Sequence, residues 1–124
     1  MRAFGELEER IMNVLWQRAD QPATVRDVHA VLTRESQLAY TTVMTVMDRL
    51  CRKGLLARKL RGRAYEYVPV ISEAEHTAGL MHELLARTGD RKNALAHFVR
   101  GIRKGDEAEL LRLVDDAGRR RRNR

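Results

Sequence analysis

The sequence contains a single cysteine, Cys51, among its 124 residues. One thiol cannot form a disulfide within the chain, and it cannot build a metal site from a cluster of cysteines. Long hydrophobic runs are also absent, since the longest span only a few residues, far short of the roughly 20 that a membrane-spanning helix needs. The N-terminal segment MRAFGELEER turns acidic at once and lacks the apolar core of a signal peptide. We therefore expect a cytoplasmic protein without membrane insertion.

The motifs of common catalytic sites are missing as well. The sequence has no glycine-rich phosphate loop, no Gly-x-Ser-x-Gly motif and no clustered acid pair that indicates a catalytic site. The four histidines are scattered, and no pair combines a metal-ligand spacing with carboxylates: His29, His76, His82 and His97. We expect neither an enzyme nor a protein that depends on a cofactor or a metal.

Charge, by contrast, is plentiful and unevenly distributed. Charged residues make up 33% of the chain, and its net charge is +7. Residues 1–71 carry 12 Lys/Arg and 8 Asp/Glu, and residues 72–118 carry 7 and 9. Residues 119–124, RRRRNR, add five arginines. The positive excess therefore lies in the N-terminal part and at the C-terminal end, which is compatible with binding nucleic acid or an acidic membrane surface.

The segment Ala39–Leu50, AYTTVMTVMDRL, has the pattern of an amphipathic helix. Val43, Val46, Met47 and Leu50 follow the spacing i, i+3, i+4 and i+7 of one apolar face. The opposite face carries mostly short side chains, namely Thr41, Thr42, Met44, Thr45, Asp48 and Arg52. A helix that packs on one side and presents hydroxyls, methyls and cations on the other suits the DNA major groove.

Residues at the two ends of this helix have alternative roles. Tyr40 is predicted to lie at the DNA backbone, or else to pack between this helix and the preceding one. Arg52 and Lys53 could reach the backbone, or they could simply be placed favourably at the C-terminus of the helix. Gly54 is predicted to end the helix, because glycine is favoured immediately after a helix end.

Two strand-like runs follow, Leu55–Leu60 and Ala64–Val70, with Arg61-Gly62-Arg63 as the turn between them. Pro69 is expected to end the second strand or to lie at an edge. The basic side chains of this hairpin are candidates for contacts to DNA phosphates: Arg58, Lys59, Arg61 and Arg63. The alternative is a solvated edge whose charge discourages strand pairing.

Apolar spacing predicts two earlier helices, over Leu7–Trp16 and Val25–Leu32. Thr24, followed three residues later by Asp27, resembles a capping box at the start of the second. We expect Trp16 to pack in the core beneath the hairpin. A helix, a short polar link, a second amphipathic helix and a basic hairpin are the components of a winged helix-turn-helix. We place this DNA-binding domain in residues 1–71.

Residues 72–118 are predicted to form three short helices, opened by a second capping box at Ser72 and Glu75. Without a sheet to cover, these helices bury little surface alone, so their apolar faces need a partner, most simply a second copy. The expected dimerisation residues are Leu80, Leu84, Phe98, Val99, Leu110 and Val114. Residues 119–124 are expected to form a disordered basic tail that adds non-specific DNA affinity, contacts anionic lipid or is simply solvated. The fold class is mainly α with a small β-wing, a winged helix-turn-helix plus a C-terminal helical dimerisation segment.

Four stretches together resemble the BlaI/MecI/CopY group of bacterial repressors: LEERIMNVLW, TVRDVHAVL, AYTTVMTVMDRLCRKGLL and a wing ending in AYEYVPV. The resemblance covers nearly the whole chain, including the short helical C-terminus. It implies a homodimeric repressor that binds a palindromic operator in double-stranded DNA. Many members control β-lactam resistance genes, and in those systems a membrane-bound sensor metalloprotease triggers cleavage of the repressor within its dimerisation helices.

The resemblance also implies roles for particular residues. The base-facing positions of the recognition helix are Thr41, Thr42, Met44 and Thr45. Staphylococcal relatives have a lysine and an arginine where Thr41 and Met44 stand, and the residues present here favour thymine methyls over guanine. The implied cleavage position is His97-Phe98, which keeps the phenylalanine of the group but not its asparagine. The Cys-x-Cys tail of the copper-responsive members is absent.

Two other functions stay open at this point. A nucleoid-type module would bind DNA without sequence preference, through its charge and its arginine tail. Specific protection of an operator against excess random DNA separates that function from repression. A repressor of the same fold could also respond to a small ligand or to a redox event at Cys51 rather than to proteolysis.

Overall fold

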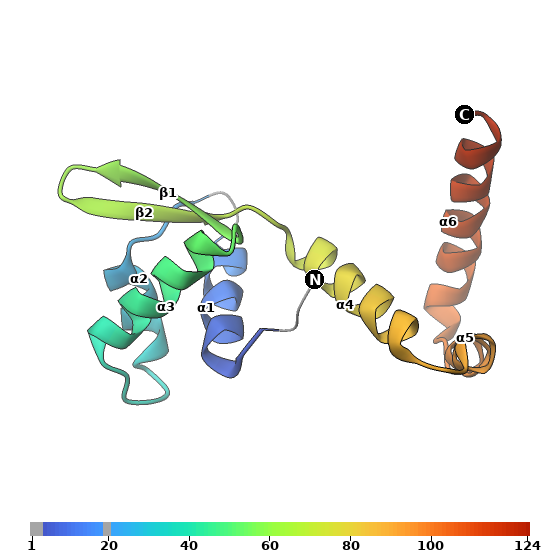
Figure 1. Cartoon of the computed structure of the whole chain (residues 1–124), viewed down its shortest axis with the longest axis horizontal. Coiled ribbons are helices and arrows are strands. Elements are labelled where there is room, and N and C mark those ends of the chain that lie inside the picture. The colour runs from blue at the N-terminus through green and yellow to red at the C-terminus, as the bar shows by residue number, and fades with distance from the viewer. Residues whose placement is uncertain (1–3, 19–20) are drawn as a thin grey trace. The chain divides into compact units, whose positions relative to one another are not determined.

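The computed structural model describes residues 4–18 and 21–124 (Figure 1). Its elements are, in order, α1 (Glu6–Gln17), α2 (Val25–Leu32), α3 (Tyr40–Arg52), β1 (Leu56–Arg61), β2 (Ala64–Pro69), α4 (Glu73–Arg87), α5 (Arg91–Arg100) and α6 (Lys104–Arg122). Contacts between residues divide the chain into two units, Met1–Glu83 and Leu84–Arg124. The first unit therefore includes the first turns of α4 as well as the predicted DNA-binding domain. Within the described ranges, no helix is long and apolar enough to cross a membrane.

The ends of α2 and α3 are fixed by the predicted local motifs. At the start of α2, the Thr24 side chain accepts a hydrogen bond from the Asp27 backbone at 3.1 Å, and Asp27 accepts one from the Thr24 backbone at 3.0 Å. At the end of α3, Gly54 has a φ of 80°. The Leu55 amide donates to the Leu50 carbonyl, and the Gly54 amide to the Cys51 carbonyl, both at 3.0 Å. This is a Schellman motif, which needs a residue without Cβ strain at the glycine position.

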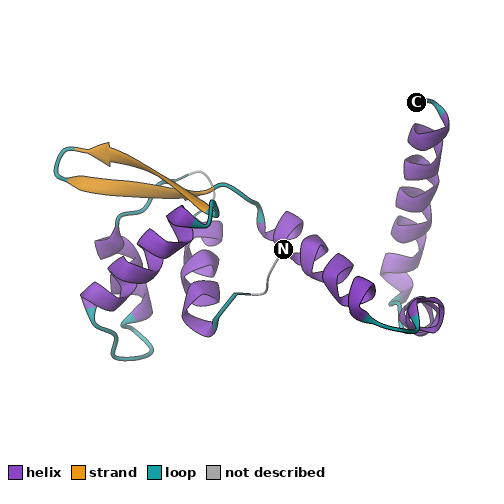
Figure 2. Ribbon diagram, viewed as in Figure 1, coloured by secondary structure: helices purple, strands orange, loops and turns teal. Residues whose placement is uncertain are grey.

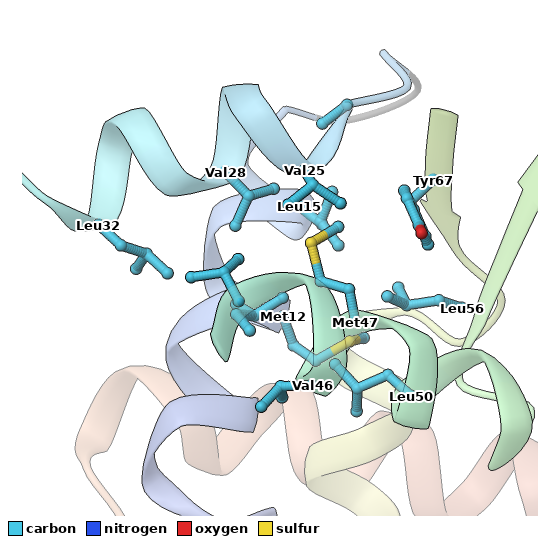
Figure 3. Close-up of a cluster of buried hydrophobic side chains, with 13 residues drawn as sticks. Met12, Leu15, Val25, Val28, Leu32, Val46, Met47, Leu50, Leu56 and Tyr67 are labelled. Atoms are coloured by element: carbon cyan, nitrogen blue, oxygen red, sulfur yellow. The ribbon is translucent and has the colours of Figure 1, made fainter. Parts of the chain in front are cut away.

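The hydrophobic core of the first unit is built by α1, α2, α3 and the hairpin. Figure 3 shows side chains from these elements gathered in one cluster. The buried residues are Ile11, Met12, Leu15, Ala23, Val25, Val28, Leu32, Val43, Val46, Met47, Leu50, Leu56 and Tyr67. The predicted apolar stripe of α3 is buried in full, so its other face is left exposed beside the hairpin.

The predicted hairpin is the only sheet in the described part of the chain (Figure 2). β1 and β2 pair antiparallel, from Leu56 opposite Pro69 to Arg61 opposite Ala64. Two hydrogen bonds between Ala23 and Tyr67, of 3.1 and 2.8 Å, attach the hairpin to the segment before α2. The wing is therefore anchored at its base to the helical core, while its tip is exposed.

Trp16 is half-buried and packs against the core, as predicted, but its indole is turned toward the segment that follows the hairpin. The sequence predicts it beneath the hairpin, but its indole Nε1 donates to the Ile71 carbonyl at 2.9 Å. Its ring centroid lies 5.7 Å from that of His76 and 6.3 Å from that of Phe4. A partly buried indole N–H requires an acceptor, and the segment leading into α4 supplies one. Trp16 thus joins α1 to the start of α4.

The second unit, Leu84–Arg124, contrasts with the first because none of its residues is buried. The structure describes every residue of this unit. The expectation of a disordered tail over residues 119–124 is wrong for most of that segment, since α6 continues through Arg122. Arginine is a good helix former and is favoured in the last turn. Arg119 also pairs with Asp115 at 2.8 Å and with Asp116 at 3.0 Å, within the same helix.

Candidate nucleic-acid interface

The exposed side of α3, the N-terminus of α2 and one face of the hairpin enclose an open groove in the first unit, here called the helix–wing groove. Its lining residues are Thr24, Val25, Arg26, Tyr40, Met44, Thr45, Asp48, Arg52, Arg58, Arg63, Ala64, Tyr65 and Tyr67. Four of them are arginines, so the groove presents a concentration of positive charge next to the predicted recognition face.

The threonines of α3 lie together, as predicted, on its exposed side. Thr41, Thr42 and Thr45 line a shallow hollow with Val46 and Arg49. The Thr45 hydroxyl donates its hydrogen to the Thr41 carbonyl at 2.8 Å. Its oxygen can still accept a hydrogen bond and its methyl group remains available, and these are the two groups that threonine offers to base edges.

Tyr40 combines the two alternatives that the sequence leaves open. Its ring packs edge-on against His29 of α2, with centroids 5.5 Å apart. The residue is nevertheless 45% exposed and lines the helix–wing groove. It therefore packs between α2 and α3 while still presenting surface at the edge of the recognition helix.

Asp48 joins α3 to the wing through two arginines. One carboxylate oxygen lies 2.7 Å from Arg52, a turn further along α3, and the other accepts from Arg58 of β1 at 3.1 Å. The Arg58 guanidinium also lies over the Tyr65 ring, 4.3 Å from its centroid. A hydrogen bond to Tyr67 raises the pKa of Arg58 above its usual value. Arg58 is thus charged and held in one place.

The four basic candidates of the hairpin do not lie on one surface. Cross-strand partners share a face, so Arg58 lies with Tyr67, whereas Lys59 lies with Glu66 on the other face. Arg61 is on that second face too, 3.6 Å from Glu66. The helix–wing groove is lined by Arg58 and Arg63, and Lys59 and Arg61 are not among its lining residues.

Two cations near the recognition helix have places that the sequence does not predict. Lys53 pairs with Glu8 of α1 at 2.8 Å, and this hydrogen bond lowers the pKa of the Glu8 carboxyl. Arg26, which the sequence analysis missed, lines the helix–wing groove from the first turn of α2. A signal for it existed, because a cation in the first turn opposes the helix dipole and therefore does not serve helix stability.

Cys51 lies in α3 but is half-buried. Burial raises the pKa of its thiol, which lowers the fraction of the reactive thiolate. The environment of this residue is therefore that of a packing cysteine rather than of an exposed redox sensor.

The residues predicted for dimerisation are largely exposed. Leu84, Phe98, Val99 and Val114 expose between 51 and 67% of their surface. Leu80 and Leu110 are half-buried. His97 and Phe98, the implied cleavage position, lie within α5, where they line a hollow against α6 with Ile102, Leu110 and Leu113 among others.

Comparison with known proteins adds independent findings. A family model described as penicillinase repressor matches residues 4–116. The chain is 46% identical over 112 residues to the transcriptional regulator BlaI of Mycobacterium tuberculosis, covering 88% of this chain and 80% of that protein. It is 25% identical over 117 residues to the penicillinase repressor of Bacillus licheniformis, covering 91% and 90%. The solved DNA-binding domain of a repressor BlaI is similar in structure, with a TM-score of 0.52, 27% identity and coverage of 60% of this chain and 93% of that one.

Proposed function

The chain belongs to the penicillinase repressor family, and from this premise we propose that it is a homodimeric repressor that binds a pseudo-palindromic operator. It is a transcriptional regulator with a winged-helix DNA-binding domain. The observation that carries the proposal is the exposed threonine face of α3, next to a groove lined by four arginines. We place its action in the cytoplasm, where a regulator of this bacterial family meets its operator.

In this proposal α3 enters the major groove with its threonine face toward the bases. The base contacts come from Thr41, Thr42, Met44 and Thr45, whose methyl groups and hydroxyl oxygens match thymine methyls and base hydrogen-bond donors. The phosphate contacts come from Tyr40, Arg26, Arg52, Arg58 and Arg63 around the groove. Lys59 and Arg61, on the other face of the wing, reach phosphates outside the half-site. The phosphate contacts position the protein and carry no sequence information.

A second copy of this chain is the proposed partner of the C-terminal helices. Their exposed apolar residues include Leu84, Phe98 and Val114, and Leu80, Val99 and Leu110 belong to the same proposed interface. Residues 72–118 carry more acidic than basic side chains, so DNA is a poor candidate to cover them. Two identical apolar surfaces can cover each other around a two-fold axis. The recognition helices would then meet half-sites about one helical turn apart.

Dimerisation and DNA affinity are coupled in this proposal. One half-site binds weakly at physiological salt, whereas two linked half-sites gain from effective concentration. Any event that cuts or loosens the C-terminal helices therefore releases the operator. Cleavage at His97-Phe98, initiated by a membrane sensor protease, would be one such event. Because this bond lies within α5, local unwinding must precede the cut.

Selection of bound sequences from a random duplex library, with the full chain at physiological salt, tests the repressor function. We expect enrichment of a pseudo-palindrome with half-sites about one helical turn apart. Salt-sensitive binding with no enriched motif would contradict it and would favour the nucleoid-type function instead.

A further inference from the structure

One acidic side chain lies among the cations of the helix–wing groove. Of the described residues that line the groove, Asp48 is the only acid, beside four arginines. A carboxylate on a surface that meets phosphates opposes binding to DNA of any sequence. Affinity for DNA therefore does not explain why Asp48 is among the residues that line the groove.

The geometry of Asp48 supplies another explanation. Its two oxygens contact two different arginines, Arg52 of α3 at 2.7 Å and Arg58 of β1 at 3.1 Å. Arg52 is the more exposed of the two, with 80% of its side-chain surface accessible against 36% for Arg58. Arg58 is additionally fixed by the ring of Tyr65 beneath it. One carboxylate thus holds a cation of the recognition helix and a cation of the wing at defined positions.

We propose that Asp48 is a specificity-determining residue that restrains Arg52 and Arg58. Free arginines on long side chains would swing toward phosphates of any duplex. Restrained by Asp48, they meet phosphates only where the base contacts of α3 seat the helix at full depth. Asp48 then lowers affinity for random DNA more than affinity for the operator. This inference rests on the proposed function, because it requires that α3 and the wing bind DNA together.

The test measures binding of Asp48→Asn, as the full chain, to two duplexes over a range of salt concentrations. One duplex carries the motif selected from the random library, and the other has the same length and a random sequence. For the random duplex we expect log K against log[salt] to steepen by about 0.9 for each arginine that gains a phosphate. At about 0.1 M salt, each such contact corresponds to roughly tenfold tighter binding. The operator should gain less, so that the specificity ratio falls.

Two control variants separate restraint from a general change of charge. Asp48→Glu keeps the carboxylate and should keep a salt slope close to that of the unmodified chain. Glu9→Gln removes one negative charge from an exposed position on α1 that does not line the groove, and it should leave the specificity ratio unchanged. Adding Arg58→Ala to Asp48→Asn should remove part of the gained affinity for random DNA, because Arg58 is one of the cations released.

The outcomes distinguish this inference from the proposed function. If the unmodified chain selects a motif while Asp48→Asn leaves slope and ratio unchanged, the inference alone is overturned. A loss confined to one base pair, without a change of slope, would also overturn it, since Asp48 would then contact a base directly. If the unmodified chain binds no DNA, the proposed function fails and the inference fails with it.

Discussion

The two units of the chain contain similar helices but bury their apolar side chains very differently. In the described part of the first unit, thirteen hydrophobic residues from three helices, the hairpin and the segment before α2 form one core. In Leu84–Arg124, all of it described, no side chain is buried, and Leu84 is 67% exposed. Short helices owe most of their stability to packing of an apolar face. The first unit therefore supplies its own packing, whereas the second leaves its apolar side chains exposed, and in our proposal a second copy of the chain covers them.

This difference suggests a division of labour within one short chain. The self-sufficient unit presents a fixed DNA-binding surface, with α3 and the wing held on a common core. In the proposed dimer the second unit gains its packing through association, so its state can respond to anything that changes association. A regulator built in this way can change its DNA affinity without any change in the structure of its DNA-binding domain.

The largest expected effect comes from breaking the association of the second unit. Leu84→Asp should convert the dimer to a monomer, because it places a charge on an apolar interface. Operator affinity should fall by roughly 10²–10⁴, the gain that linkage of two binding sites provides. Analytical ultracentrifugation and operator binding measure the two effects. His82→Asp adds the same charge at an exposed polar position of α4 and should remain dimeric. A dimeric Leu84→Asp would move the interface elsewhere.

A cavity in the core should destabilise the first unit alone. Leu50 is fully buried whereas Leu113 of α6 is 54% exposed. Leu50→Ala should lower the free energy of unfolding by about 2–5 kcal/mol, through lost burial and the cavity left behind. Leu113→Ala should change the unfolding of the first unit little and weaken association instead. Urea unfolding at two protein concentrations separates these effects. Equal destabilisation by both variants at all concentrations would contradict a self-sufficient first unit.

Two arginines on opposite faces of the wing should differ in their effect on DNA binding. Arg63 lines the helix–wing groove, whereas Arg61 faces Glu66 on the other side. Arg63→Ala should weaken binding to all sequences by roughly tenfold at about 0.1 M salt. It should also reduce the slope of log K against log[salt] by about 0.9, the contribution of one phosphate contact. Arg61→Ala should have a smaller effect of the same kind. A larger loss for Arg61→Ala would place the DNA on the other face of the hairpin. Neither variant should change the oligomeric state.

Thr45→Ala tests whether the exposed face of α3 in the first unit recognises the operator sequence. The variant removes a methyl group and a hydroxyl oxygen from the exposed face of α3. We expect a loss of about 1 kcal/mol in discrimination at one base pair of each half-site. A panel of operator duplexes with single base changes measures it. Unchanged preferences across the panel would exclude Thr45 from base recognition.

The smallest expected effect concerns acid stability at the start of α2. The hydrogen bond from the Thr24 backbone is the main cause that lowers the pKa of Asp27 below the usual range of an aspartate. A carboxyl whose pKa is lower in the folded than in the unfolded state stabilises the fold at pH values above its unfolded-state pKa. That stabilisation is lost as the pH falls to the folded-state pKa. Asp27→Ala removes the N3 half of the capping box, so it should lower the free energy of unfolding at neutral pH by less than the roughly 1 kcal/mol typical of an N-cap substitution. The effect should be smaller still below the usual pKa of aspartate. Asp90→Ala serves as the control, because Asp90 is the N-cap residue of α5 and its carboxylate accepts no capping hydrogen bond from the described residues. An equal effect of Asp27→Ala at pH 7 and in acid would show that the lowered pKa is irrelevant.

Much of the first unit could be predicted because its determinants are local. The apolar stripe of α3, the Thr24–Asp27 capping box and the glycine at position 54 each act within a few residues of the chain. The exposed threonine face followed from the same periodicity, since residues opposite a buried stripe must face outward. The hairpin and its turn also follow from alternation and from glycine.

The features that escaped prediction depend on contacts between distant residues. The place of Trp16 was decided by the Ile71 carbonyl, 55 positions away. The division of the basic hairpin into two faces followed from strand register, and Asp48 became important only through Arg58 of the wing. The helix over the C-terminal arginines depends on helix propensity and on the pairing of Arg119 with Asp115 and Asp116, and a run of like charges does not indicate it.

Hydroxyl-radical footprinting of the selected operator with the full chain, at physiological salt and with excess random DNA, tests the central claim most directly. The proposed repressor dimer predicts two protected half-sites, related by a two-fold axis and about one helical turn apart. Leu84→Asp at the same concentration should protect neither. Diffuse protection that disappears with added salt or competitor, in both proteins alike, would contradict the claim, because charge rather than a dimeric recognition surface would then carry the binding.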